Sequence, residues 1–298
     1  MKLPHRRQFL HLAAGAAALP FAPHIARAQA YPTRPVRIIV GFPAGSGPDI
    51  TARLMGQGLS ERLGQQCVIE NRLGAGGNIA TEAVVRSPPD GYTLLLVNAS
   101  NTINATLYTN LNFNLIRDVT PVTGIGHTSY GMLVNQSFPV KTVPEFIAYA
   151  KSNTGKINMA SAGSGSGPDL LSGQVQVAFA PMTSSIGYIQ AGTLRALAVT
   201  GATRSEALPN IPTVGEFVPG YEAIGWYGLG APKDTPAAII DKLNNEINAV
   251  LADPTMKTRL LALGAEPMPM TSADFGKFMS DETEKWGKVV KFAGIKPE

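Results

Sequence analysis

The chain has 298 residues, a formal net charge of +4 and a single cysteine, Cys67. One cysteine excludes an intrachain disulfide and a multi-thiolate metal site, and we expect neither a metal nor a cofactor. No Lys- or Arg-rich run is present after the first residues, so we expect no nucleic-acid partner.

The first thirty residues are typical of an export signal. Lys2, Arg6 and Arg7 precede a short apolar stretch, which is interrupted by a proline and ends in small residues. This stretch is too short to span a bilayer, and the paired arginines favour a twin-arginine signal over an ordinary secretory leader. We expect cleavage near Ala28 to Ala30, a periplasmic location and no membrane insertion afterwards. The basic residues of the leader account for the net charge, so the remainder is balanced.

The region after the leader predicts strands that alternate with helices. Apolar runs predict strands at 36–40, 67–70 and 92–97, and helical periodicity predicts helices at 50–63 and 78–86. This order implies a mainly parallel sheet with helices on its faces.

The middle of the chain predicts a second α/β lobe. We expect strands at 129–135, 157–162, 174–180 and 194–200, and helices at 142–152 and 183–192. The segment 224–232 would return the chain to the first lobe, and apolar stripes over 239–251 and 275–290 predict two amphipathic helices there. The predicted domains are therefore lobe 1, residues 31–127 plus 228–298, and lobe 2, residues 128–227.

A glycine-rich loop, "GFPAGSGPDI" at 41–50, joins the first strand to the first helix. Gly45, Ser46 and Gly47 allow a ligand to approach the backbone closely, and Pro48 suits the first helical position. The helix N-terminus would offer unpaired N–H groups to a carboxylate or phosphate, while Asp49 would stabilise the helix dipole or accept a ligand donor. The spacing fits neither a Walker loop nor a dinucleotide loop, and a plain structural turn remains an alternative.

A second loop of the same composition, "SAGSGSGPD" at 161–169, follows a predicted strand of the second lobe. One such loop from each lobe would make a clamp around a small anion. The loop serines, Ser46, Ser164 and Ser166, have no evident catalytic base unless His127 serves, and we expect His127 to be structural.

These segments, taken in order, resemble the extracytoplasmic solute-binding receptors of tripartite tricarboxylate transporters, the Bug family. The matching stretches include "YPTRPVRIIVGFPAGSGPDITARL", "VIENRLGAGGNIATEAVVRSPPDGYTLLL", "AGTLRALAVT" and "GWYGLGAP". The resemblance implies a two-lobed, type II-like periplasmic binding protein without catalysis. Such a receptor captures a small carboxylate, such as a dicarboxylate, tricarboxylate or related organic acid, in the cleft between its lobes. It then delivers the carboxylate to a membrane permease, and we expect it to be a monomer.

The resemblance also implies the ligand-binding residues, through backbone amides and bridging waters. They are, in the first lobe, Phe42, Gly45, Ser46, Gly47, Pro48 and Asp49; in the second lobe, Ser161, Ala162, Gly163, Gly165 and Ser166; and at the border of the cleft, Asn98, Ala99 and Ser100.

The sequence departs from the family in three places. Leu73 replaces a usual proline, Ala180 stands where an aspartate is frequent, and about thirty residues are missing after Ser166. The loss predicts a second lobe truncated by one strand and one helix, with a gap or an altered strand order in its sheet and exposed apolar surface. A short helical turn at 168–171 would rebuild at best a partial anion site, so we expect weakened or absent ligand binding. Two alternatives remain: an exported cofactor-dependent enzyme, and a degenerate receptor that has lost its ligand.

Overall fold

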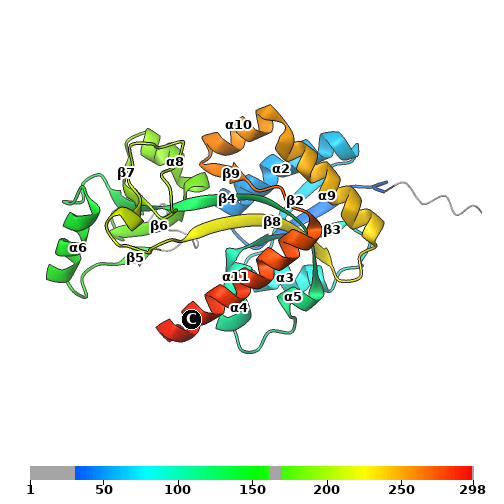
Figure 1. Cartoon of the computed structure of the whole chain (residues 1–298), viewed down its shortest axis with the longest axis horizontal. Coiled ribbons are helices and arrows are strands. Elements are labelled where there is room, and N and C mark those ends of the chain that lie inside the picture. Colours follow the sequence, from blue (N-terminus) through cyan, green and yellow to red (C-terminus); the bar gives the residue numbers. More distant parts are fainter. Residues whose placement is uncertain (1–30, 161–169, 297–298) are drawn as a thin grey trace, which may run out of the picture.

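The computed structural model describes residues 31–160 and 170–296, which form an elongated α/β molecule with two lobes (Figure 1). The predicted signal, residues 1–30, and the predicted second-lobe loop, residues 161–169, lie outside the described residues. In the described part, no helix has the length and apolarity needed to cross a membrane.

Lobe 1 is built around a mixed sheet with the order β2-β1-β3-β8-β4, to which β9 adds along β4. Its elements are β1 (Val36–Val40), α2 (Gly47–Leu63), β2 (Cys67–Asn71), η1 (Ala75–Gly77), α3 (Asn78–Val85), β3 (Thr93–Asn98), α4 (Ala99–Leu107), α5 (Leu115–Asp118), β8 (Ile224–Pro232), α9 (Ala237–Ala252), α10 (Pro254–Ala262), β9 (Ala265–Pro267) and α11 (Ser272–Ala293). The prediction of a mainly parallel sheet is correct for β2-β1-β3 and wrong for the rest. β8, β4 and β9 pair antiparallel because the chain leaves lobe 1 along β4 and returns along β8.

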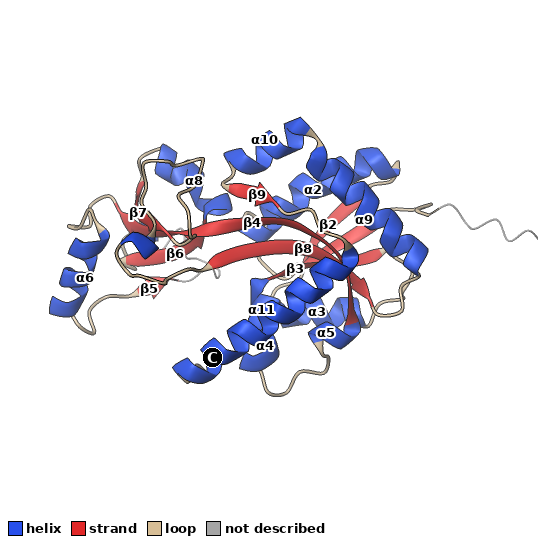
Figure 2. Cartoon of the chain, viewed as in Figure 1, coloured by secondary structure: helices blue, strands red, loops and turns tan. Residues whose placement is uncertain are grey.

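Helices cover both faces of this sheet, as predicted (Figure 2). On one face α2, α9 and α10 pack on β1 and β3 through a core that includes Leu59, Leu94 and Leu243. On the other face α3 and α11 pack through Trp226 and Phe275. The buried strands and helix stripes of the sequence therefore form two apolar layers, one on each side of the sheet.

The strand β4 (Val119–Asn135) connects the two lobes. Its first part pairs with β8 up to Ser129, and its last part, from Tyr130 onward, pairs with β6 and β7. The change of partners falls close to the predicted boundary after His127; the two boundaries themselves remain predictions. Because β8 runs back beside β4, the connection between the lobes consists of two paired strands.

Lobe 2 contains a smaller sheet with the order β5-β6-β4-β7. Its other elements are α6 (Val143–Ser152), β5 (Met159–Ala160), β6 (Val177–Pro181), α8 (Met182–Gln190), β7 (Leu194–Val199) and η2 (Val214–Glu216). The truncation predicted either a gap or an altered strand order in this sheet; the described strands show no gap, because β5 pairs directly with β6 in parallel register.

Strands β5 and β6 both begin later in the chain than the sequence predicts. The sequence predicted strands at 157–162 and 174–180; within the described residues β5 is Met159–Ala160 and β6 begins at Val177. Among the described residues of lobe 2, Met159 and Tyr188 are 60% and 43% exposed, but single exposed apolar side chains also occur in lobe 1, so the expected apolar surface stays a prediction.

Candidate functional site

The loop between β1 and α2 presents backbone amides at the boundary between the lobes. Gly45 adopts φ +81°, a conformation that glycine adopts without strain, and the turn brings Ser46 back so that its N–H and its hydroxyl both donate to the carbonyl of Pro43. Ser46 is the N-cap residue of α2 but makes no side-chain cap, since its hydroxyl is used within the loop. The amides of Ala44 and Gly47 have no hydrogen-bond partner among the described residues, so the start of α2 offers free donors.

Asp49 fixes the shape of this loop and lies outside the cavity lining. Its carboxylate accepts hydrogen bonds from the Gly45 amide at 2.9 Å, the Asn71 side chain at 2.8 Å and Arg53 at 2.9 Å. Asn71 also donates to the carbonyl of Phe42, so the same cluster holds both sides of the loop. Burial alone would raise the pKa of the Asp49 carboxyl, but these hydrogen bonds outweigh it and the pKa is lowered.

The start of α4 contributes side chains. Asn98, the N-cap residue, accepts a hydrogen bond from the Ser100 amide through Oδ1, and its own amide donates to Asn101, which completes a capping box. The Asn98 Nδ2 group and the Ser100 hydroxyl have no partner among the residues that the structure describes, and both residues lie at the cavity. They add two donors beside the loop of α2.

A third helix start, that of α8, comes from lobe 2. Pro181 ends β6 and is the N-cap residue of α8, which begins without a side-chain cap. Ser184 donates to the carbonyl of Pro181 at 3.1 Å. The sequence reasoning predicted this helix but missed its first turn as part of the site. The sequence "PMTSS" directly after the predicted strand could have indicated it. This stretch combines a proline with hydroxyl side chains at a helix start.

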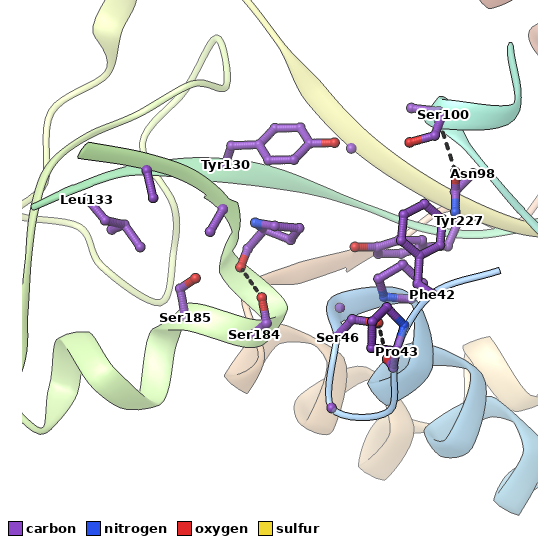
Figure 3. A pocket seen from close by; sticks show the side chains of 18 of the residues that line it. Phe42, Pro43, Ser46, Asn98, Ser100, Tyr130, Leu133, Ser184, Ser185 and Tyr227 are labelled. Carbon is purple, nitrogen blue, oxygen red and sulfur yellow. Dashed lines mark hydrogen bonds between the residues drawn. The ribbon is translucent and has the colours of Figure 1, made fainter. Parts of the chain in front are cut away.

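The three helix starts surround one cavity of about 300 Å³ between the lobes (Figure 3). Its lining comes from lobe 1, from lobe 2 and from β8: Phe42, Pro43, Ala44, Gly45, Ser46, Gly47, Pro48, Asn98, Ala99 and Ser100; Tyr130, Leu133, Leu170, Ala178, Ala180, Pro181, Ser184, Ser185, Tyr188 and Leu194; and Gly225, Trp226 and Tyr227. Within the described ranges, no charged side chain belongs to this lining. The volume lies at the small end of the range for ligand pockets.

The predicted site residues are largely brought together here. The structure places Phe42, Gly45, Ser46, Gly47, Pro48, Asn98, Ala99 and Ser100 in the cavity lining. Asp49 lies outside the lining; its Oδ2 accepts from the Gly45 amide and from Arg53, and its Oδ1 accepts from the Asn71 side chain. Ser161, Ala162, Gly163, Gly165 and Ser166 lie outside the described residues.

Two tyrosines that the sequence reasoning missed border the cavity. The Tyr130 side chain reaches across it toward Ser100 (Figure 3), and its hydroxyl has no hydrogen-bond partner in the described part of the chain. Burial raises the pKa of Tyr130 and that of Tyr227, so both hydroxyls stay protonated at neutral pH and can donate. No sequence pattern marked them, because a tyrosine in a strand reads as an ordinary packing residue.

The remaining reactive side chains lie away from the cavity. His127 Nε2 is 3.5 Å from Glu266 Oε2, and neither residue lines the cavity. The Cys67 thiol is half-buried, and burial raises its pKa, which makes it a poor nucleophile. Over residues 31–160 and 170–296, no group of three or more His, Cys, Asp or Glu side chains is arranged to hold a metal.

A ligand-sized cavity between two α/β lobes that share a pair of long strands defines the periplasmic-binding-protein fold. R. palustris Rpa4515, solved with adipate, has this fold with a TM-score of 0.85 and 33% sequence identity, over 90% of this chain and 100% of that one. MatC from Rhodopseudomonas palustris, solved with bound malate, gives a TM-score of 0.82 and 28% identity, over 87% of this chain and 100% of that one.

Sequence comparison places the chain within a family. Protein BugT of Bordetella pertussis is 33% identical over 300 residues, which cover 90% of this chain and 92% of BugT. The model of the tripartite tricarboxylate transporter family receptor matches residues 51–170 and 166–295. The chain therefore belongs to the tripartite tricarboxylate transporter receptor family. The two matched segments meet at residues 166–170, where the sequence analysis predicts that about thirty residues are missing.

Proposed function

We propose that this chain is a periplasmic receptor that captures a carboxylate in the cavity between its lobes, without catalysis, and delivers it to a membrane permease. The observation that carries this proposal is the free N-terminus of α2 at the cavity. The amides of Ala44 and Gly47, which have no partner in the described part of the chain, and the partial positive charge of the helix end suit an anion of small size.

The other groups at the cavity fit the same ligand. Ser100, Asn98 Nδ2 and the two protonated tyrosines supply neutral donors, and α8 brings a second uncapped helix start from lobe 2. A carboxylate can therefore be held without a Lys or Arg, because backbone and hydroxyl donors replace its hydration in a closed site. The dicarboxylates found in the Rpa4515 and MatC structures support this ligand chemistry.

Closure of the lobes follows from the position of the donors. The start of α2 belongs to lobe 1 and the start of α8 to lobe 2, so a ligand that contacts both stabilises the state in which the lobes meet. A permease that recognises this closed state would distinguish loaded from empty receptor. The loop serine is poorly placed for catalysis, since the Ser46 hydroxyl donates to the Pro43 carbonyl and His127 lies elsewhere.

Two measurements test the proposal. Mass spectrometry of protein purified natively and then denatured should release an organic acid, and calorimetry of ligand-stripped protein should show saturable binding of at least one carboxylate. Removal of ligand by unfolding and refolding, with recovery of the native circular dichroism, is the control for damaged protein. Refolded protein that binds no carboxylate would contradict the proposal and would favour a degenerate receptor.

A further inference from the structure

The end of α11 carries three neighbouring apolar side chains that are exposed to solvent. Val289, Phe292 and Ile295, spaced three residues apart, are 41%, 95% and 52% exposed, and we call them the α11 ridge. All of residues 291–296 are exposed, and this end of α11 lies at the edge of the molecule (Figure 1). Single exposed apolar side chains are common on proteins, but a group of them on one helix end indicates a contact surface.

The ridge stands on a well-formed helix end. Gly294 adopts φ +62°, its amide donates to the Lys291 carbonyl, and the Ile295 amide donates to the Val290 carbonyl. A left-handed glycine with these backward hydrogen bonds is a common way for a helix to stop. The three side chains therefore project from a backbone of fixed shape, and Phe292 adds almost nothing to the core of lobe 1.

Lysines surround the ridge. Residues 285–296 contain no acidic residue and four lysines: Lys285, Lys288, Lys291 and Lys296. Lys285 and Lys288 lie seven and four residues before Phe292, on the same side of the helix, and pair with acids one turn earlier. The ammonium groups of Lys291 and Lys296 have no ion-pair partner among the residues that the structure describes. The next acidic residue, Glu298, lies outside those residues.

An anionic lipid surface fits both features of this helix end. Helices bind at membrane interfaces through apolar side chains that enter the headgroup boundary, and through basic side chains that attract anionic lipids. A second copy of the chain fits less well, because it would bring two lysine-rich ends together. A stable protein interface needs about 1,000 Å² of complementary surface, which three side chains on a convex helix end do not supply.

We propose that the α11 ridge and its lysines form a peripheral, reversible contact with anionic phospholipid headgroups. The contact is separate from the carboxylate cavity, since none of these residues lines it. It involves side chains only, and in the described part no helix has the length and apolarity to cross a membrane. Such a contact would hold a receptor close to the membrane in which a permease lies.

Co-sedimentation of the full mature chain with lipid vesicles tests the proposal. One set of vesicles is phosphatidylcholine with about one-third phosphatidylglycerol, and the other is phosphatidylcholine alone. At low salt we expect saturable binding to the anionic vesicles and at least tenfold weaker binding to the neutral ones. At about 0.5 M salt, screening should weaken the binding to anionic vesicles about tenfold.

Two variants of the helix end and two matched controls locate the contact. Phe292→Ser should weaken vesicle binding about tenfold, and its thermal unfolding should be unchanged because the side chain is 95% exposed. Lys291→Glu, which reverses one charge, should weaken binding at low salt by about tenfold or more. Phe217→Ser and Lys156→Glu make the same changes at exposed positions of lobe 2 and should bind vesicles normally.

The outcomes are distinct from those for the carboxylate site, which calorimetry measures separately. A chain that does not bind anionic vesicles at low salt overturns the inference, as does equal binding to neutral vesicles. Vesicle binding that Phe292→Ser and Lys291→Glu leave unchanged also overturns it, because another surface then makes the contact. A dimer, seen by light scattering, that Phe292→Ser abolishes would assign the ridge to a second copy of the chain instead.

Discussion

Gly47, in the first turn of α2, lies so close to Thr183, in the first turn of α8, that a β-carbon on Gly47 would collide with the Thr183 hydroxyl. The same β-carbon would lie 2.7 Å from the Tyr227 hydroxyl and 3.1 Å from Pro181. The backbone of Gly47 does not require a positive φ, so the glycine is needed for close approach between the lobes. The two helix starts can face one ligand only because this position has no side chain.

Gly47→Ala should weaken ligand binding without unfolding the protein. The added methyl group holds the lobes apart at the site of closure, and such overpacking costs about 1–3 kcal/mol, which corresponds to roughly tenfold or more in Kd. Calorimetry measures the affinity. Gly187→Ala, on α8 with nothing within 4 Å of the added carbon, is the control and should bind normally. Equal affinities for the two variants would contradict closure at Gly47.

Tyr130→Phe and Tyr31→Phe should have opposite effects. The Tyr130 hydroxyl has no partner in the described structure, so its removal should leave unfolding free energy within about 0.5 kcal/mol but weaken carboxylate binding about tenfold. The Tyr31 hydroxyl donates to the Gly91 carbonyl at 2.7 Å, away from the cavity, so its loss should cost about 1 kcal/mol of stability and leave binding intact. Thermal unfolding and calorimetry on both variants check this crossed pattern, and a binding loss in Tyr31→Phe alone would contradict it.

Asp49→Asn should lower stability in a pH-dependent way. The pKa of the Asp49 carboxyl is lower in the folded protein than in the unfolded chain, so the ionised carboxylate stabilises the fold. This stabilisation is fully present above the pKa of the unfolded chain, and it is lost as the pH falls through the pKa of the folded protein. At pH 7 we expect Asp49→Asn to lower the free energy of unfolding by about 1–3 kcal/mol, and this difference should become smaller below about pH 4. Urea unfolding at pH 7 and at pH 3 measures it, with Glu61→Gln, an exposed position on the same helix, as control. An equal decrease in the free energy of unfolding at both pH values would show that the charge of Asp49 does not contribute to stability.

Glu282→Ala should destabilise lobe 1. Glu282 Oε2 accepts hydrogen bonds from the indole nitrogens of Trp226 at 3.1 Å and Trp286 at 2.9 Å, and Trp226 is fully buried. Removal of the carboxylate leaves a buried indole N–H without a partner, which costs about 2–4 kcal/mol. Tryptophan fluorescence follows urea unfolding directly, since the chain has two tryptophans. Glu284→Ala, an exposed partner of Lys288 on the same helix, should cost less than about 0.5 kcal/mol.

The glycine loop of lobe 1 could be predicted from the sequence because its chemistry is local. "GFPAGSGPDI" combines a strand end, turn glycines and a helix-starting proline, and the structure places Gly45 to Pro48 in the cavity lining. The role of Asp49 could not be predicted. Its partners Arg53 and Asn71 converge on it only in the folded chain, and Asn71 is separated from it by 22 residues.

The length of β4 was missed because its first half reads as a loop. Pro121, Gly124 and Gly126 interrupt the apolar pattern, and in the structure the register shifts at these positions. The two glycines are required by their neighbours. A β-carbon would lie 2.6 Å from the Met268 carbonyl oxygen at Gly124 and 2.8 Å from that of Glu266 at Gly126. Such constraints come from β9 and the adjoining segment, which lie more than a hundred residues later in the chain.

The lobe 2 side of the site could not be predicted because its residues are ordinary in sequence. Leu133, Ala178 and Leu194 read as core residues, and they are core residues that also reach the cavity. Only the assembled sheet shows that one side of this core faces the ligand space.

Amide chemical shifts test the central claim most directly. On titration of ligand-stripped protein with the tightest-binding carboxylate, the account predicts the largest shifts at the amides of Ala44 and Gly47, with accompanying shifts at Ser100 and Ser184. Saturable binding that shifts other amides and leaves Ala44 and Gly47 unchanged would contradict the claim that the start of α2 holds the carboxylate.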